Sequence, residues 1–193
     1  EPMIQSEPHR ILKKENGKFR HLKRPLIAVP PPIFFADKLT ESLSSSGRLV
    51  INSWGGSAIE AWIDEPTLKT VEGMDVEAAK DPKRGVHQRL ECLYNSMLWP
   101  VKNFTAKGFL WYQGESNVGK HKTYAETPED NGELWRKEWG WVIAFYYVEI
   151  APFNSTETTG CDTFVKHSSS AVYHSNSGMI STNDLVEPYE IKN

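Results

Sequence analysis

The segment at residues 113–119, QGESNVG, combines residue types that nucleophilic catalysis uses: a serine, a carboxylate and two side-chain amides. Ser116 resembles the nucleophile of a G-x-S-x-G elbow, a sharp turn between a strand and a helix. The second glycine falls one residue late, at Gly119, which favours a turn serine that caps the next helix. No Gly-Lys-Ser or Gly-Lys-Thr follows, so phosphate binding is not predicted.

Histidines are the other side chains that could act as bases or bind a metal. The chain has six of them: His9, His21, His87, His121, His167 and His174. No pair has the HExxH spacing, and nothing else in the pattern predicts a zinc site. His121 and His174 are the two candidates for a base that would serve Ser116, and a solvated histidine is the alternative for each.

The elements that must position these residues alternate between strands and helices. Short apolar runs predict strands, and apolar residues at helical spacing predict the helices between them. The predicted strands are 26–29, 49–51, 108–112, 145–150 and 178–182; the predicted helices include 33–43, 58–62, 90–98 and 121–139, the last interrupted near its middle. Such alternation indicates parallel strands joined by crossover helices, with no hairpin.

Polar turns follow three of the predicted strands, at residues 52–57, 113–119 and 183–184. Sites in open parallel sheets lie beyond the carboxyl ends of the strands, so these turns are expected to converge on one edge. Other segments carry less pattern. Residues 1–25 are polar and basic and suit a helix or a surface arm, residues 30–32 suit a turn, and residues 63–87 suit a surface excursion.

Composition excludes several classes of protein. The 193 residues include 22 basic and 25 acidic side chains, a formal charge of −3, which argues against a dedicated nucleic-acid binder. A hydrophobic fraction of 39% is sufficient for a folded core. No apolar run approaches the roughly 18 residues that span a membrane. Cys92 and Cys161 are the only cysteines, so the chain can form at most one internal disulfide.

Aromatic residues are abundant and fit either a core or a platform for sugars. The core is the favoured interpretation for the aromatic residues between 111 and 147. Trp54 and Trp62 flank the glycine pair Gly55-Gly56, and a tryptophan there is better placed to line a carbohydrate cleft.

Three motifs give the chain a family resemblance. They are VINSWGGSAIEAW at residues 50–62, LYNSM at 93–97 with GFLWYQGESN at 108–117, and FYYVEIAPF at 145–153. In this order they are similar to blocks of the sialate O-acetylesterases, a family of the SGNH (GDSL-like) hydrolases. The resemblance covers residues 26–64 and 88–153 well and 176–193 tolerably, and it leaves out 1–25 and 154–175.

The resemblance implies an α/β fold, a three-layer α/β/α sandwich with a roughly five-stranded parallel sheet. It implies a single esterase domain over residues 1–193, incomplete at both ends, with 1–25 as an arm and 26–193 as the core. It also implies a secreted or periplasmic location. The expected substrate is an acetylated sugar or polysaccharide, with no cofactor, metal, nucleic acid or membrane involved; no oligomeric state is predicted.

The mechanism implied by the resemblance is acyl transfer from an acetyl ester to a serine, with a histidine as base. Gly55 or Gly56 would donate a backbone N–H to an oxyanion hole. Gln113 or Asn117 would add a side-chain amide, and Glu115 would hold the turn or orient a neighbour.

The chain departs from the family pattern at both ends. The family's Gly-Gln-Ser-Asn nucleophile block is absent, although Gln5-Ser6 preserves two of its letters and makes Ser6 a candidate nucleophile. Asp184 is a candidate triad acid by position, with an ordinary acidic loop residue as the alternative. The Asp-x-x-His-Pro block is also absent. A sugar-binding domain without catalysis and a hydrolase that uses Ser116 therefore stay open as alternatives.

Overall fold

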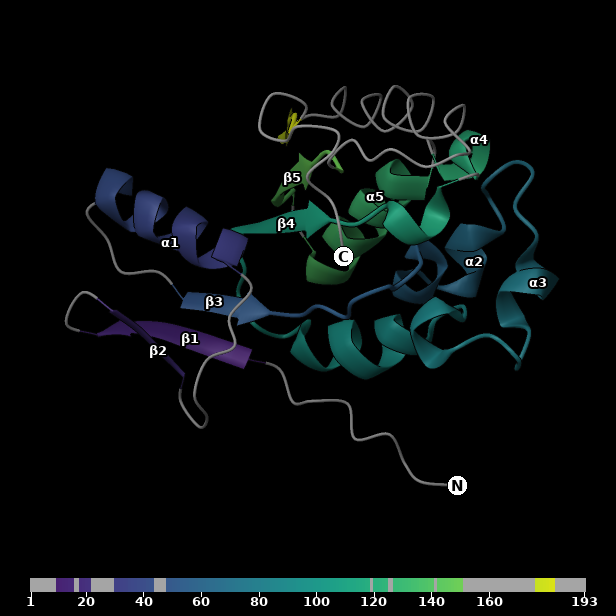
Figure 1. The fold of residues 1–193 in the computed structure, drawn as a ribbon, viewed down its shortest axis with the longest axis horizontal. Coiled ribbons are helices and arrows are strands. Elements are labelled where there is room, and N and C mark those ends of the chain that lie inside the picture. The colour runs from purple at the N-terminus through teal and green to yellow at the C-terminus, as the bar shows by residue number, and fades with distance from the viewer. Residues whose placement is uncertain are drawn as a thin grey trace, which may run out of the picture. The chain divides into compact units, whose positions relative to one another are not determined.

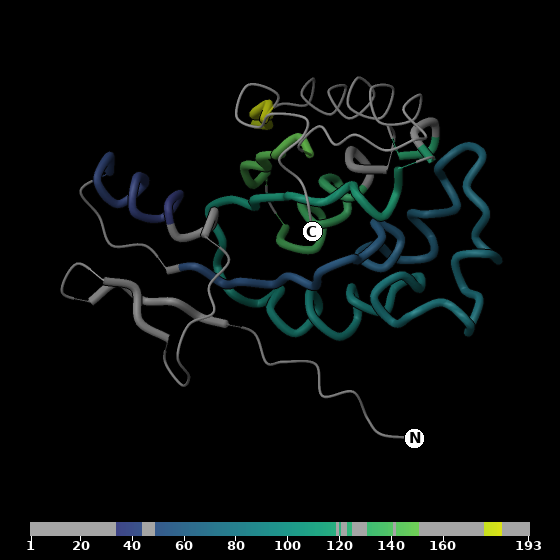
Figure 2. The backbone as a smooth tube through the Cα atoms, viewed as in Figure 1, coloured from purple at the N-terminus to yellow at the C-terminus, as the bar shows by residue number. Residues whose placement is uncertain are grey.

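The computed structural model describes residues 10–15, 18–21, 30–43, 48–118, 120–124, 127–140, 142–150 and 176–182 (Figures 1 and 2). The chain divides into two compact units, Glu1–Ser53 and Trp54–Asn193, each described here by itself. Within the described ranges, no helix is both long and apolar enough to cross a membrane.

The first unit contains an antiparallel sheet and one helix. Strands β1 (Arg10–Glu15), β2 (Lys18–His21) and β3 (Arg48–Ile51) pair in the order β2-β1-β3. Helix α1 (Pro30–Leu43) confirms the predicted helix and begins three residues before it. The turn predicted at 30–32 is wrong, because prolines in a first helical turn forfeit no intrahelical hydrogen bond.

Two predictions for this unit are corrected. The basic segment before residue 25 was expected to be a helix or an arm, whereas it supplies the hairpin strands β1 and β2. The predicted strand at 49–51 is confirmed as β3, but it pairs antiparallel with β1 and so is not a strand of a parallel sheet. The direction of pairing was wrong because it depends on the neighbouring strand β1, which the sequence pattern did not predict. The predicted strand at 26–29 lies outside the described residues.

The second unit contains a parallel sheet. Strands β4 (Gly108–Tyr112), β5 (Ala144–Val148) and β6 (Ser177–Ile180) lie in the order β4-β5-β6, and both pairs are parallel. Tyr112 pairs with Val148, and Val148 pairs with Ile180, so the three strands end level with one another. Helices and this sheet make an α/β fold, with three parallel strands among the described residues.

Helices, most of them short, precede β4 and connect β4 to β5. They are η1 (Ile59–Trp62), α2 (Glu65–Leu68), α3 (Val76–Lys80), η2 (Val86–Gln88), η3 (Tyr94–Leu98), η4 (Trp99–Val101), η5 (Glu115–Asn117), α4 (His121–Tyr124) and α5 (Thr127–Trp139). The stretch 63–87 therefore contains α2, α3 and the start of η2, and the carboxylates of Asp64 and Asp75 cap the N-termini of α2 and α3.

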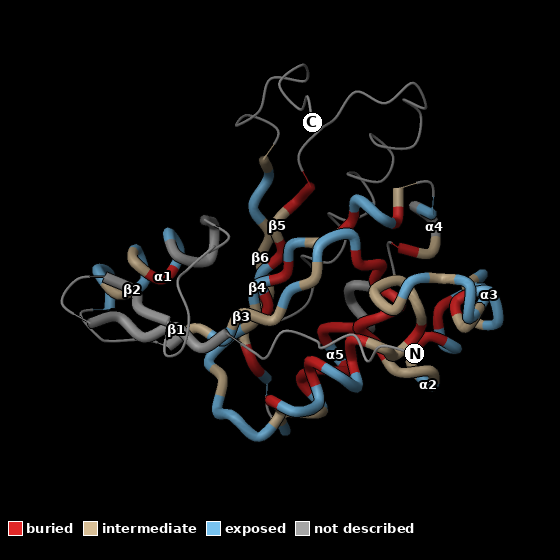
Figure 3. Tube along the Cα trace, turned by 60° about the horizontal axis from the view of Figure 1, so that its bottom comes forward, coloured by how far each residue is buried: buried red, intermediate tan, exposed pale blue. Residues whose placement is uncertain are grey.

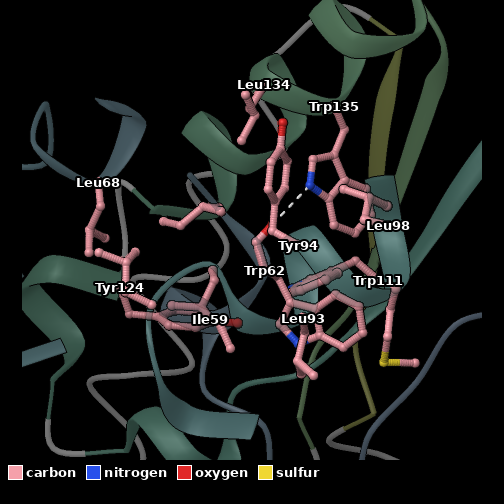
Figure 4. Close-up of a cluster of buried hydrophobic side chains, with 14 of the residues drawn as sticks. Ile59, Trp62, Leu68, Leu93, Tyr94, Leu98, Trp111, Tyr124, Leu134 and Trp135 are labelled. Atoms are coloured by element: carbon pink, nitrogen blue, oxygen red, sulfur yellow. Dashed lines mark hydrogen bonds between the residues drawn. The ribbon is translucent and has the colours of Figure 1, made fainter. Parts of the chain in front are cut away.

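The core of the second unit lies between α5 and one face of the parallel sheet. Trp135 of α5 makes edge contacts with Phe109 and Trp111 of β4, and its indole N–H donates to the carbonyl of Trp62 at 3.2 Å (Figure 4). The core prediction is confirmed for Trp111, Trp135, Phe145 and Tyr147 and is wrong for Tyr112 and Tyr146, which are exposed. Helix α5 continues through Gly132, where an added Cβ would lie 3.0 Å from the hydroxyl of Tyr147. Close packing explains a glycine where an interruption was expected.

The other face of the parallel sheet is open among the described residues. Its apolar side chains are exposed by 41% at Leu110, 49% at Tyr112, 45% at Tyr146 and 60% at Ile180. Trp111, Phe145 and Tyr147, on the opposite face, are buried. Buried residues are red along the chain trace in Figure 3. Among the described residues, helices therefore cover one face of this sheet only.

Candidate functional site

Two turns of the second unit form the candidate site. The first is the glycine turn, residues 54–58, which leads into η1. The second is the amide turn, residues 113–117, which leaves the carboxyl end of β4 and forms η5. Gly114 has a φ of 157°, which other residues rarely adopt, and this glycine lets the chain turn sharply after the strand.

Three hydrogen bonds join the two turns although they are more than 50 residues apart. The Gln113 side-chain amide donates to the carbonyl of Ser57 at 2.9 Å. The Ser116 hydroxyl donates to the carbonyl of Gly56, also at 2.9 Å. The Ile59 N–H donates to Oδ1 of Asn117 at 3.0 Å. Side chains of the amide turn therefore bind backbone groups of the glycine turn and of Ile59, the first residue of η1.

Asn117 is the centre of this network. It is 1% exposed, and its Oδ1 accepts a second hydrogen bond from Nε2 of Gln113 at 2.7 Å. Its Nδ2 donates to Oε2 of Glu60 at 2.8 Å. Both ends of the buried amide are thus engaged, as buried polar groups require.

Glu60 is a buried carboxylate directly beside Asn117. Its Oε1 accepts from Nζ of Lys120 at 2.8 Å, and the guanidinium of Arg84 lies 3.7 Å from the same oxygen. Burial by itself would raise the pKa of Glu60, but hydrogen bonds from Lys120 and Asn117 outweigh it, so the net pKa is lowered. The carboxylate therefore stays charged at neutral pH, balanced by nearby cations.

Tyr124 of α4 supports the amide turn from its other side. Its hydroxyl lies 2.7 Å from the carbonyl and 2.9 Å from Oε1 of Gln113, and it donates to these oxygens. Burial raises the pKa of Tyr124 far above its ordinary value, so the phenol keeps its proton. The Gln113 amide is consequently held at both its nitrogen and its oxygen.

The glycine turn presents backbone rather than side chains. Gly55 and Gly56 are exposed, and no residue in the described parts of the chain accepts a hydrogen bond from either N–H. Gly56 has a φ of 72°, in the left-handed region. Adjacent unpaired N–H groups in such a turn are suited to bind an anion or a developing oxyanion.

Two half-buried rings flank the glycine turn. The rings of Trp54 and His87 lie parallel, at 3° between planes and 6.2 Å between centroids. A Cβ added at Gly56 would lie 3.9 Å from Nε2 of His87. The carbonyl of His87 accepts from the N–H of Ala58 at 3.0 Å, which holds the main chain of His87 beside the turn. Flat rings at this position suit a sugar.

Chemically, this arrangement can stabilise negative charge that develops on a bound carbonyl oxygen. The N–H groups of the exposed glycine turn are available as donors, next to the hydrogen-bonded network around Asn117. Among the described residues, no group of three or more His, Cys, Asp or Glu side chains is placed to hold a metal ion.

Comparison with known protein families gives the context for this site. A family model described as "Carbohydrate esterase, sialic acid-specific acetylesterase" matches residues 5–190, nearly the whole chain. The chain belongs to this family. The expected relationship to the sialate O-acetylesterases is thereby confirmed.

Individual members with this name are similar over part of the chain. The sialate O-acetylesterase of Homo sapiens is 36% identical over 92 residues, which cover 44% of this chain and 16% of that protein. The mouse protein, from Mus musculus, is 32% identical over 113 residues, which cover 44% of this chain and 20% of that protein. The matched segments thus span a fifth or less of these relatives.

The structure brings together four of the residues expected from the esterase motifs: Gly55, Gly56, Gln113 and Asn117. Glu115 lies exposed in η5, one residue before Ser116. The hydroxyl of Ser116 is bonded to the Gly56 carbonyl and makes no side-chain cap for η5.

Among the other candidates, His121 is the first residue of α4. Ser6, Asp184, His174 and Cys161 lie outside the described residues, and Cys92 is a free cysteine. Trp62 is 3% exposed and donates its indole N–H to the hydroxyl of Ser57, which places it in the core rather than in a sugar cleft.

Sequence reasoning missed the residues that hold the site together, Glu60, Lys120 and Tyr124, and the flanking His87. One signal was present for Glu60: it is the single charge within the apolar run 58–63. A charge at such a position is rarely buried unless it is paired. Lys120 and Tyr124 are four residues apart, a spacing that places two side chains on one face of a helix.

Proposed function

We propose that the protein containing this chain hydrolyses O-acetyl esters on carbohydrates, with O-acetylated sialic acid as the substrate class and no cofactor. The observation that carries the proposal is the exposed glycine turn, whose N–H groups have no acceptor among the described residues. Membership of the carbohydrate esterase family supports the choice of reaction.

The oxyanion hole would combine backbone and side-chain donors. Gly55 and Gly56 supply N–H groups to the acetyl oxygen as it becomes negative. Gln113 is the amide that a substrate can reach, because it is half-buried whereas Asn117 is 1% exposed. In donating to the oxyanion, Gln113 would exchange its bond to the Ser57 carbonyl for one to substrate. Each such donor typically contributes about 10²–10³ in kcat.

The covalent steps need a nucleophile and a base. The oxygen of Ser6 attacks the acetyl carbon and gives its proton to a histidine, which passes it to the departing sugar oxygen. Water then cleaves the acetyl–serine ester and releases acetate. Asp184 orients the histidine, and Glu115 orients a neighbour in the amide turn. The family match extends over Ser6 and Asp184, which supports these assignments.

For the complete domain we propose the three-layer α/β/α sandwich with about five parallel strands, as a single esterase domain. The uncovered apolar face of the β4-β5-β6 sheet supports this arrangement, because Leu110, Tyr146 and Ile180 are exposed there. A parallel sheet is normally covered by helices on both faces.

Acetate release from 4-nitrophenyl acetate and from an O-acetylated sialic acid tests the proposal on the full-length protein. Turnover is expected, and Ser6→Ala should abolish it. Ser96→Ala is a matched control, because Ser96 is exposed and donates only to the Cys92 carbonyl. Turnover that survives Ser6→Ala contradicts the nucleophile assignment. Thermal stabilisation by the acetylated sugar without any acetate release would instead indicate a binding domain.

A further inference from the structure

We propose that Glu60 is a positioning residue for this esterase site: its carboxylate determines which way the side-chain amides of Asn117 and Gln113 point. The inference rests on the proposed function. Glu60 is 0% exposed, so it does not touch substrate and must act through the residues that it contacts. Its test therefore needs a measurement that does not depend on acetate release.

The orientation of the Asn117 amide depends on its partners. An amide has similar shape in its two orientations, so hydrogen bonding alone selects one. A carboxylate only accepts hydrogen bonds, so Oε2 of Glu60 draws Nδ2 of Asn117 toward itself at 2.8 Å. Oδ1 then faces the N–H of Ile59. In the flipped orientation, the NH₂ group would oppose that N–H and leave both buried donors unpaired.

The effect continues to Gln113 through the same amide. Nε2 of Gln113 donates to Oδ1 of Asn117 at 2.7 Å and to the carbonyl of Ser57 at 2.9 Å. Its Oε1 accepts from the hydroxyl of Tyr124. The carboxylate thus orders a relay that ends at the glycine turn, where the oxyanion donors lie.

The carboxylate is itself fixed by cations. Nζ of Lys120 donates to Oε1 at 2.8 Å, and Arg84 approaches the same oxygen at 3.7 Å. Because the cations occupy Oε1, Oε2 is left for Asn117. The relay therefore starts at Oε2 of Glu60, which accepts from Asn117, and each donor in it points back toward this oxygen.

A donor–acceptor exchange tests this relay. In Glu60→Gln, the new amide keeps an oxygen for Lys120 but directs an NH₂ group at the NH₂ group of Asn117. In Asn117→Asp, two carboxylates face each other at hydrogen-bond distance. In the double variant Glu60→Gln/Asn117→Asp, the glutamine amide donates to the aspartate, whose other oxygen still accepts from Ile59 and Gln113. The double variant also retains one negative charge at the buried pair.

Each single variant should lower kcat by about 10²-fold, as expected for displaced catalytic groups, with a smaller change in KM. The double variant should recover kcat to within about tenfold of the wild-type value. The side-chain NH₂ resonances of Gln113 provide the independent measurement: they should shift in each single variant and return in the double variant. Glu77→Gln makes the same chemical change at an exposed carboxylate and should alter neither.

Unchanged kcat and Gln113 resonances in Glu60→Gln would overturn the proposal, as would a double variant no better than the single ones. If a single variant does not fold, the double variant should still fold with wild-type Gln113 resonances, and its failure to do so would also overturn the proposal. If the wild-type protein releases no acetate, the proposed function fails, but the Gln113 resonances still decide whether Glu60 orients the amides.

Discussion

The glycine turn and the amide turn lie against each other but differ in what they offer. The glycine turn is exposed, and no described residue accepts from the N–H groups of Gly55 or Gly56. In the amide turn, Asn117 is buried and both ends of its side chain are bonded. The glycine turn presents backbone N–H groups, whereas the buried side-chain amide of Asn117 makes its hydrogen bonds within the protein.

This difference indicates a division of roles. Donors stabilise a transition state best when they are already oriented, because no reorganisation is then needed as charge develops. Gly55 and Gly56 have no side chains with which to anchor the glycine turn. The hydrogen bonds from Gln113 and Ser116 to its carbonyls anchor it from the neighbouring turn. The amide turn therefore acts as support for the glycine turn, and each can be disturbed separately.

The largest effect is expected from Asn117→Ala. The substitution removes the hydrogen bonds that Asn117 makes to Oε2 of Glu60, to the Ile59 N–H and to Nε2 of Gln113, and the free energy of unfolding should fall by about 3–5 kcal/mol. Urea denaturation measures this change. Asn95→Ala, at an exposed helical position, should stay within about 0.5 kcal/mol of the wild type. Equal stability of the two variants would contradict the supporting role of the amide turn.

A smaller effect is expected when the glycine turn is changed. Gly56→Ala places a Cβ at a φ of 72° and should cost about 1–2 kcal/mol, with a loss of kcat as the donors shift. At Gly55, an added Cβ meets nothing within 4 Å, so Gly55→Ala is the matched control and should be milder in both measurements. If the two variants behave alike, the backbone conformation at Gly56 is not what orients the donors.

The contribution of the Glu60 carboxylate to the free energy of unfolding should depend on pH. Burial acts to raise its pKa, but hydrogen bonds from Lys120 and Asn117 prevail, and the folded-state pKa lies below the ordinary 4.5. The carboxylate therefore stabilises the fold fully above pH 4.5 and loses this contribution as pH falls through the lowered folded-state pKa. The stability difference between wild type and Glu60→Gln should narrow in that window. If the stability difference between wild type and Glu60→Gln stayed constant or widened as the pH fell, the lowered pKa of Glu60 would be contradicted.

Much of the fold was accessible from local sequence patterns. The apolar runs 108–112 and 145–150 predicted β4 and β5, with both ends of each strand correct to within two residues. The hairpin β1-β2 was missed although its signal is in the sequence: the pairing of Glu15 with Lys18 leaves Asn16-Gly17 between the strands, a preferred two-residue hairpin connection. Charged residues along β1 and β2 obscured it, because strands are usually recognised by apolar alternation.

The candidate site was predictable only in part. Polar residues after a strand identified Gln113 and Asn117, and the glycine pair identified the turn opposite them. Which amide is buried and which is reachable depends on long-range contacts that no local pattern contains. Glu60 illustrates the limit, since its partners Asn117 and Lys120 lie 57 and 60 residues away in sequence.

The smallest loss of stability is expected from Ser116→Ala. This variant also tests whether the amide turn only supports the glycine turn or carries the nucleophile. The hydroxyl of Ser116 makes one exposed hydrogen bond, to the Gly56 carbonyl at 2.9 Å. Its loss should cost about 0.5–1.5 kcal/mol of stability, and acetate release should persist, because the bond only steadies the glycine turn. Unfolding and turnover are measured on the same preparation, with Ser96→Ala beside it. Complete loss of turnover with the fold intact would make Ser116 the nucleophile, and the amide turn would then carry the chemistry itself.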